Sequence, residues 1–127
     1  MDVLTQLIGT EYDNTKEFCG QFESGMLWYL ENCENTVLEL YRRLLQMKNA
    51  GWFKNANGIL IGRTFSKESI SDFTYEDALH KTFDDLNIPV IYDVDFGHVP
   101  PQLTLINGSF AKFEYESGKG KIKQELV

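Results

Sequence analysis

The apolar and polar positions of the chain predict three short strands separated by two amphipathic helices. Short, mostly apolar runs stand at 26–30, 59–62 and 89–94, bounded by glycine, proline or charged residues, as is typical of buried strands. Between these runs, apolar residues recur at helical spacing after Thr36 and again after Thr74. Each threonine is therefore expected to cap a helix that buries one face.

The first of these helices has the clearest signals, and the N-terminal segment has the weakest. Thr36 and Glu39 fit a capping box, in which each residue satisfies a backbone amide of the other. Gly51 is expected to end the helix, because glycine readily adopts the left-handed conformation found there. Residues 4–10 predict only a short helix, and residues 11–15 read as a loop.

The pattern changes near the C-terminus. Residues 103–106 and 110–115 flank Asn107-Gly108, a pair typical of a tight hairpin turn. A last alternating strand is expected at 121–126. Strands alternating with helices, then a run of strands, predict an α/β fold. More closely, we expect a small layered β/β/α domain with short buried strands, two amphipathic helices and a C-terminal antiparallel β-meander.

Composition limits the class of protein. The 127 residues suffice for one domain, taken as 1–127. Twelve basic and 19 acidic residues give a net charge of −7, which argues against nucleic acid or an anionic membrane as partner. The Met1-Asp2-Val3 start does not resemble a signal peptide. Cys19 and Cys33 are too few for a disulfide framework and lack metal-ligand spacing. These features favour a soluble, cytoplasmic domain.

Three polar residues stand just after predicted strands, where open α/β sheets place ligand groups. Glu31 follows the first strand, Arg63 follows the second, and His98 lies in the loop beyond the third. That loop holds one glycine and two prolines and could fix an imidazole as a general base or acid requires. Arg63 could bind a substrate carboxylate. Each could equally be a polar surface residue, and His80, within the second helix, is expected to be solvated.

Glu31 and His98 together suggest a histidine base oriented by a carboxylate, but the chain offers no clear nucleophile. There is no Gly-x-Ser-x-Gly motif, and the serines lie in ordinary loop or turn contexts. Nothing marks Cys33 as a reactive thiol. Two isolated histidines without a paired-cysteine or His-Glu-x-x-His motif give no metal ligand set. The pair amounts to two thirds of a catalytic triad.

The pair lies within a longer series of recognisable segments. The segments are Leu7–Tyr12, Gly25–Glu31, Tyr41–Met47, Ala50–Phe53, Gly58–Gly62, Ile88–Val90, Asp95–His98 and Leu103–Leu105. Through them the chain resembles the C-terminal domain of the LD-carboxypeptidase family of serine peptidases, from about Leu4 to Val127. The most specific motif is Gly97-His98 ahead of the Leu-Thr-Leu segment.

The resemblance implies a function and a division of labour. Glu31 matches the family's triad glutamate and His98 its triad histidine. The family's serine nucleophile and oxyanion hole lie in an N-terminal domain that is absent from 1–127, so this chain alone is expected to be inactive. The implied substrates are murein tetrapeptides or microcin-like peptides, with Asp95–His98 closer to the microcin immunity branch.

The resemblance also implies no metal or organic cofactor, a cytoplasmic location, the N-terminal domain of the same enzyme as partner, and frequent homodimers. Two other functions stay open: a module that binds a small peptide at Glu31 and His98 without cleaving it, and a purely structural or interaction domain.

Overall fold

The computed structural model describes residues 1–126 and contains an α/β domain with two separate sheets. In chain order the elements are α1 (Asp2–Thr5), α2 (Thr15–Gly20), β1 (Met26–Leu30), α3 (Val37–Asn49), β2 (Ala56–Gly62), α4 (Tyr75–Phe83), the 3-10 helix η1 (Asp84–Leu86), β3 (Val90–Val94), β4 (Phe110–Glu116) and β5 (Lys119–Glu125). The predicted fold class is confirmed, with three parallel strands alternating with α3 and α4 and an antiparallel pair at the C-terminus.

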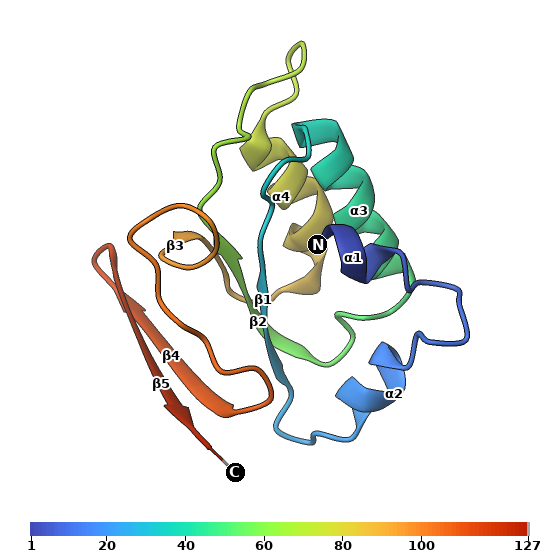
Figure 1. Ribbon diagram of the computed structural model, residues 1–127, viewed down its shortest axis with the longest axis vertical. Coiled ribbons are helices and arrows are strands. Elements are labelled where there is room, and N and C mark those ends of the chain that lie inside the picture. Colours follow the sequence, from blue (N-terminus) through green and yellow to red (C-terminus); the bar gives the residue numbers. More distant parts are fainter. Residues whose placement is uncertain (127) are drawn as a thin grey trace.

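The three parallel strands lie in the order β1-β2-β3, so β2 is central. Helices α3 and α4 pack against each other on one face of this sheet, and the β4–β5 hairpin covers the other face (Figure 1). Because all three strands run in the same direction, their carboxyl ends meet at one edge. That edge receives the segments that follow Leu30, Gly62 and Val94.

The core lies between the sheet and the two helices. Ile59 and Ile61 of β2 are fully buried there, together with Leu40 and Leu44 of α3. The helix is fixed at its start by the expected capping box: the Thr36 amide donates to Glu39 Oε2 at 2.8 Å, and Thr36 Oγ1 accepts from the Glu39 amide.

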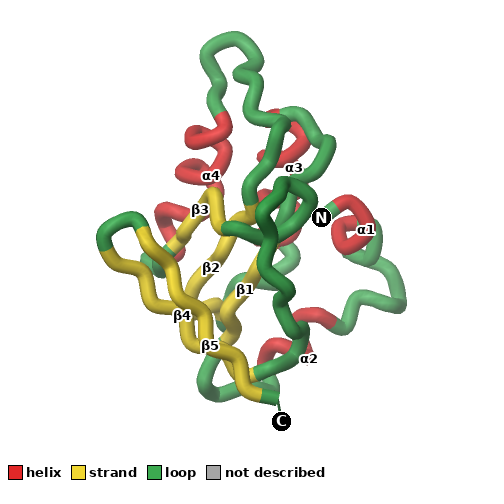
Figure 2. The backbone as a smooth tube through the Cα atoms, turned by 60° about the vertical axis from the view of Figure 1, so that its left-hand side comes forward, coloured by secondary structure: helices red, strands yellow, loops and turns green. Residues whose placement is uncertain are grey.

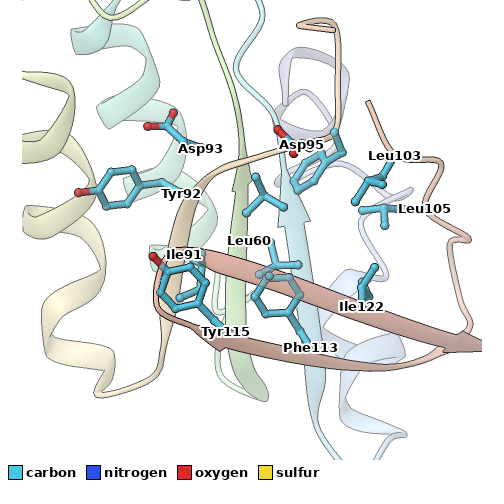
Figure 3. A pocket seen from close by; sticks show the side chains of 14 residues that line it. Leu60, Ile91, Tyr92, Asp93, Asp95, Leu103, Leu105, Phe113, Tyr115 and Ile122 are labelled. Atoms are coloured by element: carbon cyan, nitrogen blue, oxygen red, sulfur yellow. The ribbon is translucent and has the colours of Figure 1, made fainter. Parts of the chain in front are cut away.

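The side chains of β2 alternate between the two faces of the sheet, as a strand requires. Leu60 points away from the helices and lines a cavity of about 280 Å³ beneath the hairpin. Phe113 and Tyr115 of β4 face Leu60 and Ile91 across this space (Figure 3). The hairpin runs across the sheet as a second layer (Figure 2).

Two sequence expectations for the C-terminal region are wrong in detail. Residues 103–106 form no strand, and the hairpin turn lies at Ser117-Gly118 instead of Asn107-Gly108. At Ile106, a side chain makes the backbone hydrogen bonds that a neighbouring strand would otherwise make. Gln124 accepts from the Ile106 amide at 3.1 Å and donates to the Ile106 carbonyl at 3.0 Å. The backbone of Ile106 is thereby satisfied without a neighbouring strand.

The N-terminal expectation is also incomplete. Helix α1 ends at Thr5, earlier than expected, and α2 begins where only a loop was expected. Helix α2 is held by a distant side chain, since Asn55 Nδ2 donates to the carbonyls of Cys19 and Phe22, each at 2.8 Å. Such a tertiary contact leaves no periodic pattern in the sequence.

None of the helices within residues 1–126 combines the length and the apolar character needed to cross a bilayer.

Candidate functional site

The candidate site is at the carboxyl edge of the parallel sheet, where Glu31 and His98 meet. Glu31 directly follows β1, whose last residue, Leu30, is buried in the core. Its side chain is 20% exposed, whereas that of His98, in the loop after β3, is 71% exposed. A carboxylate anchored on the sheet thus faces an imidazole that is open to solvent.

The loop after β3 must cross the end of β2 to reach Glu31, because β2 lies between β1 and β3. Gly62, the last residue of β2, permits that crossing. A Cβ atom there would stand 2.7 Å from the Phe96 carbonyl oxygen and 2.9 Å from its ring. Phe96 is buried and makes an edge-to-face contact with Tyr29 of β1, with ring centroids 5.7 Å apart. The aromatic pair fixes the loop over the sheet edge.

Gly97 then turns the chain so that His98 reaches Glu31. Its φ is +102°, and a Cβ atom there would lie 2.3 Å from the Glu31 carboxyl group. Glycine is needed both for this backbone conformation and for the close approach. The sequence showed a glycine before His98, but not that it packs against Glu31.

One oxygen of Glu31 receives two hydrogen bonds from His98. The backbone amide of His98 donates to Oε1 at 2.5 Å, and ring atom Nδ1 lies 2.7 Å from the same oxygen. The carboxylate can only accept, so Nδ1 carries the proton and Nε2 is left with a lone pair. Within residues 1–126, no hydroxyl group is hydrogen-bonded to His98. This arrangement can orient an imidazole and stabilise its charged form.

Arg63 follows β2 and contacts the loop after β3 that carries His98. Its Nε lies 3.0 Å from Asp95 Oδ1, forming an ion pair. Nη2 donates to the carbonyl oxygen of Val99 at 3.2 Å and also to that of Pro101. These contacts make Arg63 a positioning residue for the loop. Substrate binding by Arg63, expected from the sequence, stays a prediction.

His80 lies apart from the site, on α4. Its Nδ1 is 3.0 Å from Asp84 one helical turn later, and both side chains are more than 60% exposed. The sequence expectation of a solvated histidine agrees with this position. The His80–Asp84 pair has the same two functional groups as His98–Glu31, without an anchored carboxylate.

One family model matches most of the chain, including the carboxyl edge of the sheet. Residues 1–113 match the family model described as the LD-carboxypeptidase C-terminal domain. The chain belongs to the LD-carboxypeptidase family. The match includes both Glu31 and His98 and ends within β4.

Two relatives of this LD-carboxypeptidase domain are longer than the chain. A putative carboxypeptidase of Synechocystis is 29% identical over 121 residues, which cover 93% of this chain and 38% of that protein. The crystal structure of muramoyltetrapeptide carboxypeptidase from Oxalobacter formigenes superposes with a TM-score of 0.79 at 21% identity, covering 97% of this chain and 41% of that one. The domain therefore spans about two fifths of the length of these relatives.

Cys33 lies beside the Glu31–His98 pair, a position that the sequence did not reveal. Its Sγ, a Glu31 carboxylate oxygen and a His98 ring nitrogen all lie within 4.8 Å of one another. Desolvation, followed by the negative charges of Glu31 and Glu34, raises the pKa of the Cys33 thiol. A nucleophilic cysteine requires a lowered pKa, so this environment does not favour Cys33 as a nucleophile.

Proposed function

We propose that Glu31 and His98 are the glutamate and the histidine of a Ser-Glu-His triad in an LD-carboxypeptidase that acts on murein tetrapeptide. The serine is supplied by another domain of the enzyme. The observation that carries the proposal is the 2.7 Å contact between Glu31 Oε1 and His98 Nδ1. It leaves Nε2 with a lone pair on a solvent-facing ring, as a general base requires.

The residues act in two steps. In the first, His98 Nε2 accepts the serine proton while the serine oxygen attacks the scissile carbonyl carbon. The imidazolium then donates that proton to the leaving amine, and an acyl-enzyme forms. In the second step, His98 takes a proton from water as the water oxygen attacks the acyl carbon. The imidazolium then returns that proton to the departing serine oxygen, which restores the free serine and neutral His98. Glu31 keeps the proton on Nδ1 and stabilises the imidazolium in both steps.

The substrate is inferred from two supports. The family name points to an LD-carboxypeptidase, and the name of the Oxalobacter relative, muramoyltetrapeptide carboxypeptidase, points to murein tetrapeptide as the substrate. A microcin-like peptide is the second candidate, through the likeness of Asp95–His98 to the immunity branch. We also propose a cytoplasmic location and a homodimer, both of which the family resemblance implies.

The first experiment tests the orientation of the ring in the chain itself. The chain has two histidines, so ¹⁵N shifts of the ring nitrogens can be assigned by substitution. We expect neutral His98 to carry its proton on Nδ1 and to lose that preference in Glu31→Gln. Asp84→Asn is the matched control, because it changes the exposed His80 pair and should leave His98 unaffected. A mixed tautomer at His98 in the unmodified chain would contradict the proposal.

The second experiment tests catalysis in the enzyme that joins this domain to a serine-bearing N-terminal domain. Glu31→Gln should lower kcat roughly 10³–10⁴-fold with little change in KM, because the wrong tautomer is favoured while binding contacts remain. The chain alone should not hydrolyse murein tetrapeptide. If Glu31→Gln and His98→Ala retain full activity, the triad assignment is wrong. Peptide binding without turnover would instead indicate the non-catalytic binding module.

A further inference from the structure

Cys33 reaches the candidate site from a rigid turn after β1. The side chain of Asn32 donates to the Asn35 carbonyl at 2.9 Å, and the Asn35 side chain donates back to Asn32 Oδ1 at 2.9 Å. Both asparagines are buried. Ser66 Oγ also donates to the Cys33 carbonyl at 3.1 Å. These bonds fix the backbone on both sides of Cys33, so the thiol is held beside the Glu31–His98 pair.

Glu31, Cys33 and His98 offer an oxygen, a sulfur and a nitrogen ligand. Zn²⁺ accepts all three types at about 2.0–2.3 Å, which places tetrahedral ligand atoms roughly 3.3–3.8 Å apart. The three atoms now lie within 4.8 Å of one another, so an adjustment of roughly 1 Å brings them to that spacing. The His98 side chain is 71% exposed, so its ring has room to move, and metal binding would replace the 2.7 Å contact between Nδ1 and Glu31 Oε1.

We propose that Glu31, Cys33 and His98 form a Zn²⁺ site that blocks the catalytic pair when the ion is bound. Zn²⁺ is the ion of choice because a thiolate, an imidazole and a carboxylate suit it better than Mg²⁺ or Ca²⁺. On binding, Cys33 releases its thiol proton to solvent. The thiolate and the Glu31 carboxylate then balance the two positive charges of the ion.

The surroundings support a cation at this place. The negative charges of Glu31, Glu34 and Asp2 act on Cys33, opposed by the single positive charge of the N-terminus, whose nitrogen lies 3.3 Å from the Glu31 carbonyl oxygen. The same negative charges lower the free energy of a divalent cation there. A cysteine binds a metal ion as the thiolate, so loss of the Cys33 thiol proton is coupled to metal binding.

Blocking follows from the electron pairs of the imidazole. A neutral ring has one lone pair, and a bound metal uses it, whichever ring nitrogen is the ligand. His98 with Zn²⁺ bound therefore cannot accept a serine proton. Binding of the ion does not depend on the proposed function, whereas its inhibitory effect rests on it.

The test begins with Co²⁺ as a spectroscopic substitute for Zn²⁺ on the chain itself. A bound thiolate gives a sulfur-to-cobalt charge-transfer band, which should appear on titration and disappear when Zn²⁺ is added. Cys33→Ser should abolish the band and weaken Zn²⁺ binding at least tenfold, because even outer contacts of a metal ligand contribute roughly 10–100-fold. Cys19→Ser is the matched control and should keep the band, since Cys19 is a buried residue of α2 and not one of the three proposed ligands. Far-UV circular dichroism verifies that each variant is folded.

Two results would overturn the site: no charge-transfer band with Co²⁺, or equal Zn²⁺ affinity in the unmodified chain and Cys33→Ser. Inhibition is then measured in the enzyme that contains both domains. Cys33→Ser should keep basal activity and need at least tenfold more Zn²⁺ for half inhibition. Zinc binding that depends on Cys33, together with an active His98→Ala enzyme, would refute the triad but not the site. No zinc binding by the unmodified chain, together with an inactive His98→Ala enzyme, would refute the site alone.

Discussion

The central strand β2 and the hairpin strand β4 have the same length but opposite environments. Five consecutive residues of β2, Gly58–Gly62, are buried, whereas β4 has no buried residue among its seven. The helices cover β2 on one face and the hairpin covers it on the other. Burial on both faces gives the carboxyl edge of the sheet the rigid support that a catalytic pair needs. The hairpin covers the sheet without contributing to that edge.

The largest expected effect comes from a core position on the sheet side. Leu44→Ala on α3 removes a fully buried side chain and should lower the free energy of unfolding by about 2–5 kcal/mol. The matching change in the hairpin is Phe110→Ala, at a side chain that is 56% exposed. It should cost less than about 1 kcal/mol. Urea unfolding of both variants measures the difference. An equal loss would mean that the hairpin supports the fold as strongly as the helical layer.

The same contrast explains which parts of the fold could be predicted from the sequence. Helix α3 combines local signals that agree with one another: the Thr36–Glu39 capping box, an apolar face and Gly51 at its end. Short apolar runs also predict the positions of β1, β2 and β3. The expectation that all three are buried holds only for β2, because β1 has one buried residue and β3 has none. For α4 the cap Thr74 was found, but its partner Asp77 was not, although their side chains form a second capping box.

The hairpin could not be placed from the sequence because its decisive contact joins distant residues. Asn107-Gly108 is a strong local turn signal, and Gly108 does adopt a positive φ of +77°. The segment before it forms no strand, because the Gln124 side chain already satisfies the backbone of Ile106. Local propensity indicated the bend at Gly108 but could not show whether a strand lies on each side of it.

The candidate site was predictable as two residues but not as a contact. Glu31 and His98 are 67 positions apart, and only the strand order shows that the loop must cross the end of β2. Gly62 and Gly97 make the crossing possible, and their role depends on what a Cβ atom would meet. No single-sequence pattern contains that information. The position of Cys33 beside Glu31 and His98 likewise depends on the fold and leaves no pattern in the sequence.

Two glycines allow a matched comparison: Gly97 lies in the loop after β3, at the sheet edge, and Gly108 lies just before the hairpin strand β4. Gly97→Ala and Gly108→Ala both place alanine at a positive φ, which costs roughly 1–3 kcal/mol of stability. Only at Gly97 does the new Cβ meet another group, the Glu31 carboxyl; Gly108 has no atom within 4 Å. We expect Gly97→Ala to displace the His98 ring and change its ¹⁵N shifts. Gly108→Ala should leave those shifts unchanged. Unchanged shifts in both variants would show that His98 does not depend on the turn at Gly97.

The smallest expected effect is a difference in acid sensitivity between two exposed carboxylates. The Thr36 amide and hydroxyl lower the pKa of Glu39 below its usual value of 4.5. The Lys112 side chain, 2.7 Å away, similarly lowers the pKa of Glu114 on β4. A carboxylate whose pKa is lower in the folded state stabilises the fold above its unfolded pKa. That contribution is lost as pH falls through the folded pKa.

The pH-dependent contributions of Glu39 and Glu114 to stability should differ, because only the Glu39 contact requires the folded chain. The Thr36–Glu39 box exists only when α3 is formed, whereas Lys112 and Glu114 are two residues apart on an exposed strand and can approach in the unfolded chain as well. Glu39→Gln should therefore flatten the decline of unfolding free energy below about pH 4.5. Glu114→Gln should change it little, and 0.5 M salt, about three times the physiological ionic strength, should remove what remains. Denaturant unfolding at several pH values measures both slopes. A larger effect from Glu114→Gln would mean that the Lys112–Glu114 pair forms only in the folded chain, despite its exposure. The contrast between β2 with its helices and the hairpin would then not extend to their charged residues.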